Sequence, residues 1–330
     1  MYIYLNSVKE ENPGEKWQSL FEKYWPFYKE WFLSEGFTAR PGYVTSSGML
    51  EEYMPEIYPV YEQLVALAGG GDLEARFLAL YSPPKYLSAC TQLAWTKDEP
   101  VLIRNYDYDP HKFEGALLYT HWLRPVIAMS DCIWGVLDGM NDAGLCVSLA
   151  FGGRQFVGQG FGIPLILRYI LETCTLTSEA IAVLHRVPVH MPYNITILDE
   201  HKHYATVYIS PDRVPVVTGL PIGTNHQEMI EWEDYAAATA TQERKIFLET
   251  HLLNPDETLN GMIRHFLHPP LFATQYEKGF GTLYTSIYYA QKRNLKLIWP
   301  KRFLSQSFEN FKEGRTVINT HPDYKSKLSL

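Results

Sequence analysis

The chain has 330 residues, of which 46% are hydrophobic and 20% are charged, values typical of a globular protein with a large core. A net charge of −8, with no dense cluster of lysine and arginine, argues against nucleic acid or an anionic membrane surface as the main partner. No stretch approaches the roughly 20 apolar residues of a membrane span, and the N-terminus lacks the basic-then-apolar pattern of a secretion signal. We therefore expect a soluble, cytoplasmic protein that acts on a small molecule.

The first 89 residues are predicted to be mostly helical and are rich in aromatic residues. Aromatic side chains recur at helical spacing around Pro26, a residue expected to kink or split the helix. A second helix is predicted over residues 51–68 and a third from Asp72 to about Leu80. The Pro83-Pro84 pair ends the helical region and marks the best candidate boundary.

A β-hairpin is predicted directly after this boundary. Residues 92–95 and 101–107 have the character of strands, and residues 97–100 form the turn. If Thr96 faces Val101, then Cys90 faces Asp107 at a Cβ separation of about 5 Å. That register places Arg104 on the opposite face, although a one-residue bulge would reverse the arrangement. The hairpin by itself fits either a nucleophilic site or a buried cysteine beside solvated charges.

The remainder of the chain alternates groups of strands with groups of helices. This grouping favours antiparallel sheets covered by helices, an α+β fold, over a doubly wound parallel sheet. After about residue 312 we expect a polar, weakly anchored tail. The predicted strands cover residues 117–122, 133–137, 145–151, 194–198, 205–209, 282–289 and 295–299, and the predicted helices cover 164–171 and 178–184.

Several common kinds of chemistry are disfavoured. The glycines at 158, 160 and 162 are not followed by the lysine of a phosphate-binding loop, and the chain has neither a Gly-x-Ser-x-Gly elbow nor a His-Glu-x-x-His motif. The four cysteines are widely spaced, and His201 with His203 falls in a polar turn, so we expect no metal site and no cofactor. What remains is Cys90, a cysteine without an obvious histidine partner. Its own α-amine, which titrates near 7.7–8.0 when free, can act as the base if Cys90 becomes an N-terminus.

A set of short motifs carries a resemblance to a known family. Between about residues 61 and 299 the chain resembles the N-terminal nucleophile hydrolases of the penicillin acyltransferase and choloylglycine hydrolase type, and is nearer to the acyltransferase branch. The order and spacing of the motifs make the resemblance specific, although each motif is short. The motifs are Cys90-Thr91, Arg104-Asn105-Tyr106-Asp107, Gly139-Met140-Asn141 with Gly144-Leu145, Gly160-x-Gly162-Ile163-Pro164, Arg168 to Leu171, Asn194 with Asp199, and Thr224-Asn225-His226.

The resemblance implies a four-layer αββα fold and a precursor that cuts itself between Ala89 and Cys90. The Cys90 thiol would attack the carbonyl of Ala89, and the resulting bond would be hydrolysed. Residues 1–89 would then form a small helical chain and residues 90–330 the hydrolase core, with the two fragments remaining associated.

The resemblance also implies roles for individual residues. Cys90 is the nucleophile, Arg104 and Asp107 orient its amine and thiol, and Asn225 donates its side-chain amide to the oxyanion. Arg244, in Thr241-Gln242-Glu243-Arg244, is similar to the arginine of the family's Ser/Thr-x-x-Arg motif. The alternatives are that Arg104 pairs with Asp107 on a hairpin surface, that Asn225 holds a loop, and that Arg244 is an ordinary helix charge.

One position departs from the pattern. Where bile-salt hydrolases carry asparagine and penicillin V acylases carry tyrosine, this chain has Ala150-Phe151. An oxyanion donor at Ala150 or Phe151 would have to be a backbone N–H, and the identity of the substrate does not transfer.

The sequence therefore predicts a self-processing cysteine amidohydrolase or acyltransferase that cleaves a linear amide of a small acylated amine through a thioester on Cys90. Water, an amine or an acyl-CoA are the expected co-reactants. The alternative is an uncleaved, catalytically dormant homologue that binds an acyl ligand. A third hypothesis, a cysteine peptidase with a Cys-His pair, would need His226 beside Cys90.

Overall fold

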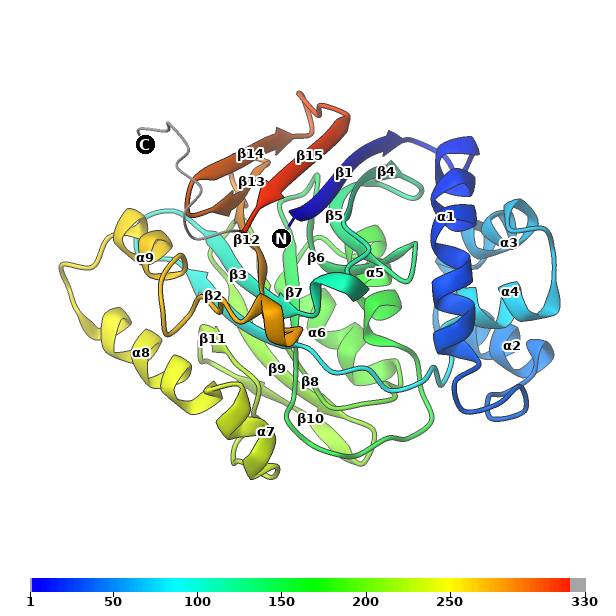
Figure 1. Ribbon diagram of the computed structural model, residues 1–330, viewed down its shortest axis with the longest axis horizontal. Helices are drawn as coiled ribbons and strands as arrows, with labels where there is room; N and C mark the ends of the chain where they lie inside the picture. Colours follow the sequence, from blue (N-terminus) through cyan, green and yellow to red (C-terminus); the bar gives the residue numbers. More distant parts are fainter. Residues whose placement is uncertain (1, 321–330) are drawn as a thin grey trace.

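Two β-sheets packed face to face form the centre of the molecule, and helices cover their outer surfaces (Figure 1). The computed structural model describes residues 2–320. The strands of both sheets alternate with helices in groups along the chain, as the sequence predicts. The architecture is thus the α+β, four-layer αββα arrangement expected from the sequence. No helix within the described residues is both long and apolar enough to cross a membrane.

The larger sheet has nine strands in the order β10-β9-β8-β7-β6-β5-β4-β1-β15. Its neighbouring strands are antiparallel, except that β1 runs parallel to β4, a pairing that the expectation of two antiparallel sheets did not include. The strands are β1 (Tyr2–Glu10), β4 (Ala116–His121), β5 (Pro125–Asp131), β6 (Gly135–Asn141), β7 (Cys146–Phe151), β8 (Tyr193–Leu198), β9 (Tyr204–Ser210), β10 (Arg213–Thr218) and β15 (Gly314–Asn319).

The smaller sheet has six antiparallel strands in the order β11-β2-β3-β12-β13-β14. Its strands β2 and β3 are buried along almost their whole length, because the larger sheet covers one face and helices cover the other. The strands are β2 (Ala89–Trp95), β3 (Val101–Tyr108), β11 (Ile222–Gly223), β12 (Gly281–Tyr289), β13 (Asn294–Trp299) and β14 (Arg302–Ser307).

Each sheet has its own helical cover. Helices α5 (Ile163–Thr173) and α6 (Thr177–Arg186) pack on the nine-stranded sheet. Helices α8 (Thr241–Leu253) and α9 (Leu259–His265) lie on the six-stranded sheet, with the short α7 (Glu233–Ala238) before them (Figure 1). A second, smaller hydrophobic core separates α8 and α9 from the six-stranded sheet, whereas the main core fills the space between the two sheets.

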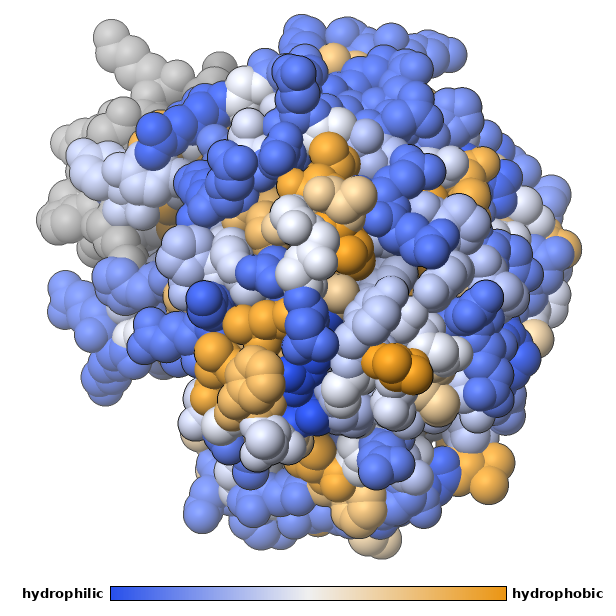
Figure 2. Space-filling model, turned by 90° about the vertical axis from the view of Figure 1, so that its right-hand side faces the viewer, coloured by the Kyte–Doolittle hydropathy of each residue, from blue (hydrophilic) through white to orange (hydrophobic). Residues whose placement is uncertain are grey.

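The N-terminal helices form a separate group at one side of the sheets (Figure 1). Some of their aromatic residues pack together: Trp25, Tyr28 and Phe32 of the first helix all contact the ring of Phe77. Figure 2 shows the face that this group presents to solvent, where hydrophilic side chains dominate and apolar ones form separate patches. The helices are α1 (Glu15–Phe32), α2 (Tyr43–Tyr53), α3 (Tyr58–Leu67) and α4 (Asp72–Leu78); single 3₁₀ turns occur at Pro55–Ile57, Pro110–Lys112 and Tyr276–Lys278.

One helix prediction in this region is wrong, and another is wrong in part. The helix expected over residues 51–68 is two helices, because Pro55 and Pro59 cannot continue a preceding helix. Pro26 does not split α1, which runs unbroken through it. Proline has no backbone N–H, so the carbonyl of Glu22 loses the hydrogen bond that residue 26 would normally donate. Glu22 is exposed, and water can supply the missing hydrogen bond.

The two ends of the described chain pair with each other. Residues 2–10, predicted as part of a helical segment, form β1, which lies between β4 and β15. The polar tail predicted after about residue 312 is wrong for residues 314–319, which form β15; the rest of that predicted tail, from residue 321, lies outside the described residues. An alternation of exposed and buried residues along β1 is the signal that identifies it as a strand.

Candidate active site

The β2–β3 hairpin has a register one residue away from the predicted one. Cys90 lies opposite Tyr106, and Ala89 lies opposite Asp107. Because side chains alternate between the faces of a strand, this shift places Arg104 on the same face as Cys90 and Asp107 on the other. The predicted pairing of Cys90 with Asp107 is therefore wrong, and so is the predicted separation of Cys90 from Arg104.

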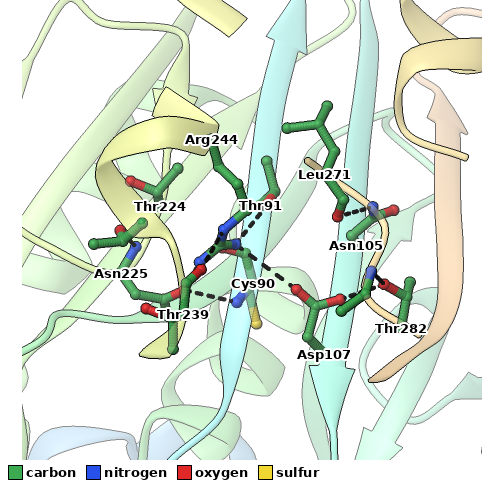
Figure 3. A network of polar contacts seen from close by, with 12 residues as sticks. Cys90, Thr91, Asn105, Asp107, Thr224, Asn225, Thr239, Arg244, Leu271 and Thr282 are labelled. Atoms are coloured by element: carbon green, nitrogen blue, oxygen red, sulfur yellow. Dashed lines mark hydrogen bonds and ion pairs between the residues drawn. The ribbon is translucent and has the colours of Figure 1, made fainter. Parts of the chain in front are cut away.

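The hairpin thus has an inner face toward the nine-stranded sheet and an outer face toward α8 and α9. Cys90 and Tyr106 belong to the main core on the inner face, whereas Leu93 and Ile103 belong to the smaller core on the outer face. Figure 3 shows Thr91 of β2 and Asp107 of β3 beside Arg244 of α8, with the Cys90 sulfur pointing away from that group.

On the inner face, Arg104 contacts the Cys90 sulfur directly. Its Nη2 donates to Cys90 Sγ at 3.1 Å, and its Nε donates to the carbonyl of Leu149 at 3.0 Å. The guanidinium also forms a fully buried ion pair with Asp138. Arg104 is therefore fixed by partners on the other sheet rather than paired with Asp107 on a surface.

The carboxylate that holds Arg104 is itself held by two tyrosines. Tyr284 and Tyr288 of β12 each donate a hydroxyl hydrogen bond of 2.6 Å to Asp138. Burial raises the pKa of both phenols well above the ordinary value, so both hydroxyls keep the proton that they donate. The positive charge of Arg104 is thus paired with the Asp138 carboxylate, and that carboxylate also accepts a hydrogen bond from each tyrosine.

The Cys90 thiol is completely buried. Its sulfur has two hydrogen-bond contacts among the described residues, Arg104 at 3.1 Å and the Ser88 hydroxyl at 3.9 Å. Burial raises the pKa of the thiol, and the guanidinium of Arg104 opposes that rise. In the continuous chain the thiol is therefore protonated at neutral pH and needs a base to react.

Asn225 holds the main chain on both sides of the Ala89–Cys90 bond. Its Oδ1 accepts the backbone N–H of Cys90 at 2.9 Å, and its Nδ2 donates to the carbonyl of Ser88 at 3.3 Å and to that of Phe151 at 3.0 Å. The side chain reaches this position because β11, two residues earlier, pairs with β2 along its free edge.

Arg244 is buried and contacts the site rather than solvent. It donates to the Cys90 carbonyl at 2.7 Å, to Thr91 Oγ1 at 2.6 Å and to Asn225 Oδ1 at 2.7 Å (Figure 3). The Asp107 carboxylate lies 3.7 Å from the same guanidinium. The alternative of an ordinary helix charge is excluded by this geometry.

Asp107 is buried on the outer face. Thr282 Oγ1 donates to its carboxylate at 2.6 Å. Burial raises the pKa of Asp107 to about 6, while Arg244 and Thr282 act in the opposite direction. Asp107 therefore changes charge within the range of ordinary working pH.

A cavity of about 990 Å³ reaches the Ala89–Cys90 bond. Ser88, Ala89 and Asp107 line it, and Cys90 lies behind them. The walls combine aromatic and charged side chains, which come from α1, the segment before β2, β3 and the turn after it, the end of β5, α7 and the 3₁₀ turn at Tyr276–Lys278. They include Phe27, Trp31, Tyr86, Tyr106, Tyr108, Tyr235, Lys85, Asp109, Lys112, Asp131 and Lys278.

Three sequence candidates occupy other places. Among the described residues, neither Ala150 nor Phe151 lines the cavity, and Phe151 presents its carbonyl rather than its N–H to Asn225. His226 hydrogen-bonds Thr241 Oγ1 at 2.9 Å and makes no hydrogen bond to Cys90, so the structure does not form the Cys-His pair. Burial lowers the pKa of His226 to about 4.

Sequence reasoning missed the residues that support the site. Asp138 directly precedes a motif that was recognised, Gly139-Met140-Asn141, and Tyr284 with Tyr288 lie four residues apart on one face of a predicted strand. Thr282 lies on the same strand, and Tyr235 donates to the Ser88 carbonyl at 2.6 Å. The four-residue spacing of Tyr284 and Tyr288 was the available signal for these two residues, but no pattern in the sequence indicates which strand faces them. The shift in register between Thr282 and Tyr284 is likewise not visible in the sequence.

The structure thus combines two sheets between helical layers with a buried cysteine near the start of β2 in the six-stranded sheet. The profile of the family "Acyl-coenzyme A:6-aminopenicillanic acid acyl-transferase" matches residues 95–303, more than half of the chain. The protein belongs to this family. The matched region contains Arg104, Asp107, Asn225 and Arg244 and begins five residues after Cys90.

Solved structures with a related fold have low sequence identity. A variant of the conjugated bile acid hydrolase from Clostridium perfringens is 14% identical, with 73% of this chain and 98% of that chain covered and a TM-score of 0.48. The N-acylethanolamine-hydrolyzing acid amidase ortholog of Caenorhabditis elegans is 15% identical, with coverages of 70% and 100% and a TM-score of 0.45. Penicillin V acylase from Agrobacterium tumefaciens is 14% identical, with coverages of 67% and 78% and a TM-score of 0.38. No curated protein sequence matches this chain significantly.

Proposed function

We propose that the protein is a cysteine amidohydrolase or acyltransferase that cleaves its own Ala89–Cys90 bond and then acts on a linear amide of a small acylated amine. The observation that carries the proposal is the position of this bond. Ser88 and Ala89 line the cavity, the Cys90 thiol is buried next to them, and Asn225 hydrogen-bonds the main chain on both sides of the bond.

In the first step, the Cys90 sulfur attacks the Ala89 carbonyl carbon. The carbon–nitrogen bond breaks, the thiol proton passes to the leaving nitrogen, and a thioester joins Ala89 to Sγ. Water then hydrolyses the thioester, which leaves a carboxylate on Ala89 and a free α-amine and thiol on Cys90. The Arg104 guanidinium favours the thiolate that forms during attack.

After cleavage, the new α-amine serves as the base for the thiol of the same residue. Asn225 Oδ1, which accepts the Cys90 N–H, is placed to orient this amine. Its Nδ2 group, released from the Ser88 carbonyl when residues 88 and 89 move away, becomes available to an oxyanion. The acyl group then passes from substrate to Sγ and from Sγ to water or to an amine.

The cavity is consistent with a small substrate that has an apolar part and a polar part. Its volume of about 990 Å³ lies at the upper end of the range for small-molecule sites. Phe27 and Trp31 of α1 supply apolar wall, and Asp131 and Lys85 supply charge. The N-terminal helices would therefore help to form the acyl pocket, which is why we expect both fragments to stay associated.

The test is the intact mass of freshly purified protein under denaturing conditions, compared with the variant Cys90→Ala. We expect the wild type to give fragments of 89 and 241 residues and the variant to give one chain of 330. Acyl amides would then be screened with the cleaved enzyme, and the variant should show no turnover.

A single full-length chain in both preparations would contradict the proposal. The α-amine would then never form, and the alternative of a dormant, uncleaved homologue that binds an acyl ligand would be preferred. Circular dichroism of both proteins is the control, since a variant that lost its fold would also fail to cleave.

A further inference from the structure

Three side chains with metal-ligating atoms converge between α8 and α9, on the outer side of the six-stranded sheet (Figure 1). His251 lies in the last turn of α8, Glu257 lies in the connection, and His265 ends α9. Their ligating atoms all lie within 4.8 Å of one another. The spacing of six and eight residues matches no short motif, so the sequence does not reveal the cluster.

The distances within the cluster suit a small divalent cation. Both imidazoles point at the same carboxylate oxygen: His251 Nδ1 lies 2.8 Å and His265 Nε2 lies 3.2 Å from Glu257 Oε2. Zinc bonds of about 2.0–2.2 Å to nitrogen and oxygen place two ligands of a tetrahedron about 3.3 Å apart. Each nitrogen therefore lies within about half an ångström of that spacing from Glu257 Oε2, and the two nitrogens lie within 4.8 Å of each other.

The surroundings hold the carboxylate in place. The Glu257 side chain is 8% exposed, whereas the two histidine side chains remain 27% and 30% exposed. The other carboxylate oxygen, Oε1, lies close to Gly261. A Cβ added to this glycine would be only 2.1 Å from Oε1, so a larger residue at position 261 would clash with the carboxylate. The carboxylate is thus packed closely against Gly261 of α9, while both histidine side chains are partly exposed to solvent.

The imidazole rings are also unusually close for two groups that can become positively charged. Their centroids lie 3.9 Å apart, with the ring of Phe247 at 4.5 Å from His251. A shared metal ion would accept the lone pair of the nitrogen that each ring directs at Glu257.

We propose that His251, Glu257 and His265 bind a divalent transition-metal ion, with zinc as the best fit, in a site separate from the cavity and from Cys90. The ion would join the C-terminal end of α8 to α9. Arg244 lies near the other end of α8, where it contacts Asn225. Asn105 Nδ2 of β3 donates to the carbonyl of Phe266, directly after α9, at 2.9 Å. The ion would therefore fix the helical layer behind the candidate active site.

The probe is Zn²⁺ itself, added to tag-free, metal-stripped full chain, with binding followed by calorimetry and by the melting temperature. In the wild type we expect one equivalent to bind. A hundredfold excess over its dissociation constant should raise the melting temperature by roughly 4 °C. Co²⁺ should give the visible absorption bands of a tetrahedral site in the same protein.

Two variants and one matched control localise the ion. Glu257→Gln keeps the shape and one hydrogen-bond acceptor but loses the anionic ligand, and His265→Gln removes a nitrogen ligand; both should lose the bound equivalent and the rise in melting temperature. His268→Gln changes an exposed histidine three residues farther along and should behave as the wild type. No binding by the wild type, or equal binding by Glu257→Gln and His265→Gln, would overturn the proposal, since the cluster would then be a hydrogen-bonded group without an ion. Each variant's apo melting temperature shows whether it remains folded.

Discussion

The two faces of the β2–β3 hairpin serve different parts of the same cysteine. On the inner face, Arg104 contacts the sulfur and is held by Asp138 from the other sheet. On the outer face, Arg244 contacts the Cys90 carbonyl and Asp107. The difference shows that the thiol and the main chain of one residue are supported by separate networks. Variants in one network should therefore change one property more than the other.

The largest effect is expected on the inner face, from Arg104→Met. Removing one partner of a buried ion pair costs about 3–5 kcal/mol, and the buried Asp138 is left without its cation. We expect a loss of stability of this size in urea unfolding, together with slow or absent cleavage at Cys90.

The double variant Arg104→Met/Asp138→Asn separates the two effects. It removes the unpaired charge, so part of the stability should return while cleavage stays slow. Cleavage at the wild-type rate in either variant would show that Arg104 does not assist the thiol.

Asn225 contacts the start of β2, and Asn225→Ala should mainly slow the cleavage before Cys90 and the hydrolysis of amides. Loss of one oxyanion donor costs about 10²–10³-fold in rate, and this side chain also holds Cys90 N–H. The measurement is the fraction of uncut chain over time after purification, followed by acyl amide hydrolysis by the cut fraction.

Gln227→Ala is the matched control for Asn225. Its side chain lies two residues farther along and donates to the Ile209 carbonyl at 3.0 Å, away from Cys90. Equal rates in the Asn225 and Gln227 variants would contradict a direct role for Asn225.

The smallest effect is expected on the outer face, from Asp107→Asn, and it depends on pH. The folded-state pKa of Asp107 is about 6, above its ordinary value of 3.8, so the folded state binds this proton more tightly than the unfolded state. The protonated Asp107 side chain stabilises the folded state fully below about pH 4. This stabilisation is lost as the pH rises through the folded-state pKa of about 6. Relative to the asparagine variant, the carboxylate protein should lose up to about 3 kcal/mol over that range.

Urea unfolding from pH 4 to 7 checks this, in a Cys90→Ala background that keeps every chain uncut. Groups other than residue 107 cancel in the difference between the two proteins. A difference that does not change with pH, or that changes in the opposite direction, would show that Asp107 is charged throughout this range.

The sequence predicted the members of the candidate site better than their arrangement. Short motifs indicated Cys90, Arg104, Asp107, Asn225 and Arg244, and the structure brings all five together. The face on which each lies depends on the register of a hairpin whose turn is compatible with two pairings. A shift of one residue was enough to exchange Arg104 and Asp107.

Other features depend on long-range pairing that local patterns do not encode. The strand β1 shows alternating burial at Ile3 and Leu5, but its partners are more than 100 residues away. Asp138 reaches Arg104 across the gap between two sheets, and His251, Glu257 and His265 meet only because α8 and α9 lie side by side. Periodicity predicted most helices and strands, and tertiary contacts decided the rest.

The place of β1 bears on the cleavage proposed before Cys90. This strand belongs to the segment before Cys90, yet it fills the interval between β4 and β15 in the larger sheet. A large fragment made without it would present two unpaired strand edges, the kind of surface that promotes aggregation. If the chain is cut before Cys90 as proposed, cutting would have to follow folding, and the N-terminal fragment would stay bound through the inserted strand β1. The two fragments would then complement each other within one sheet.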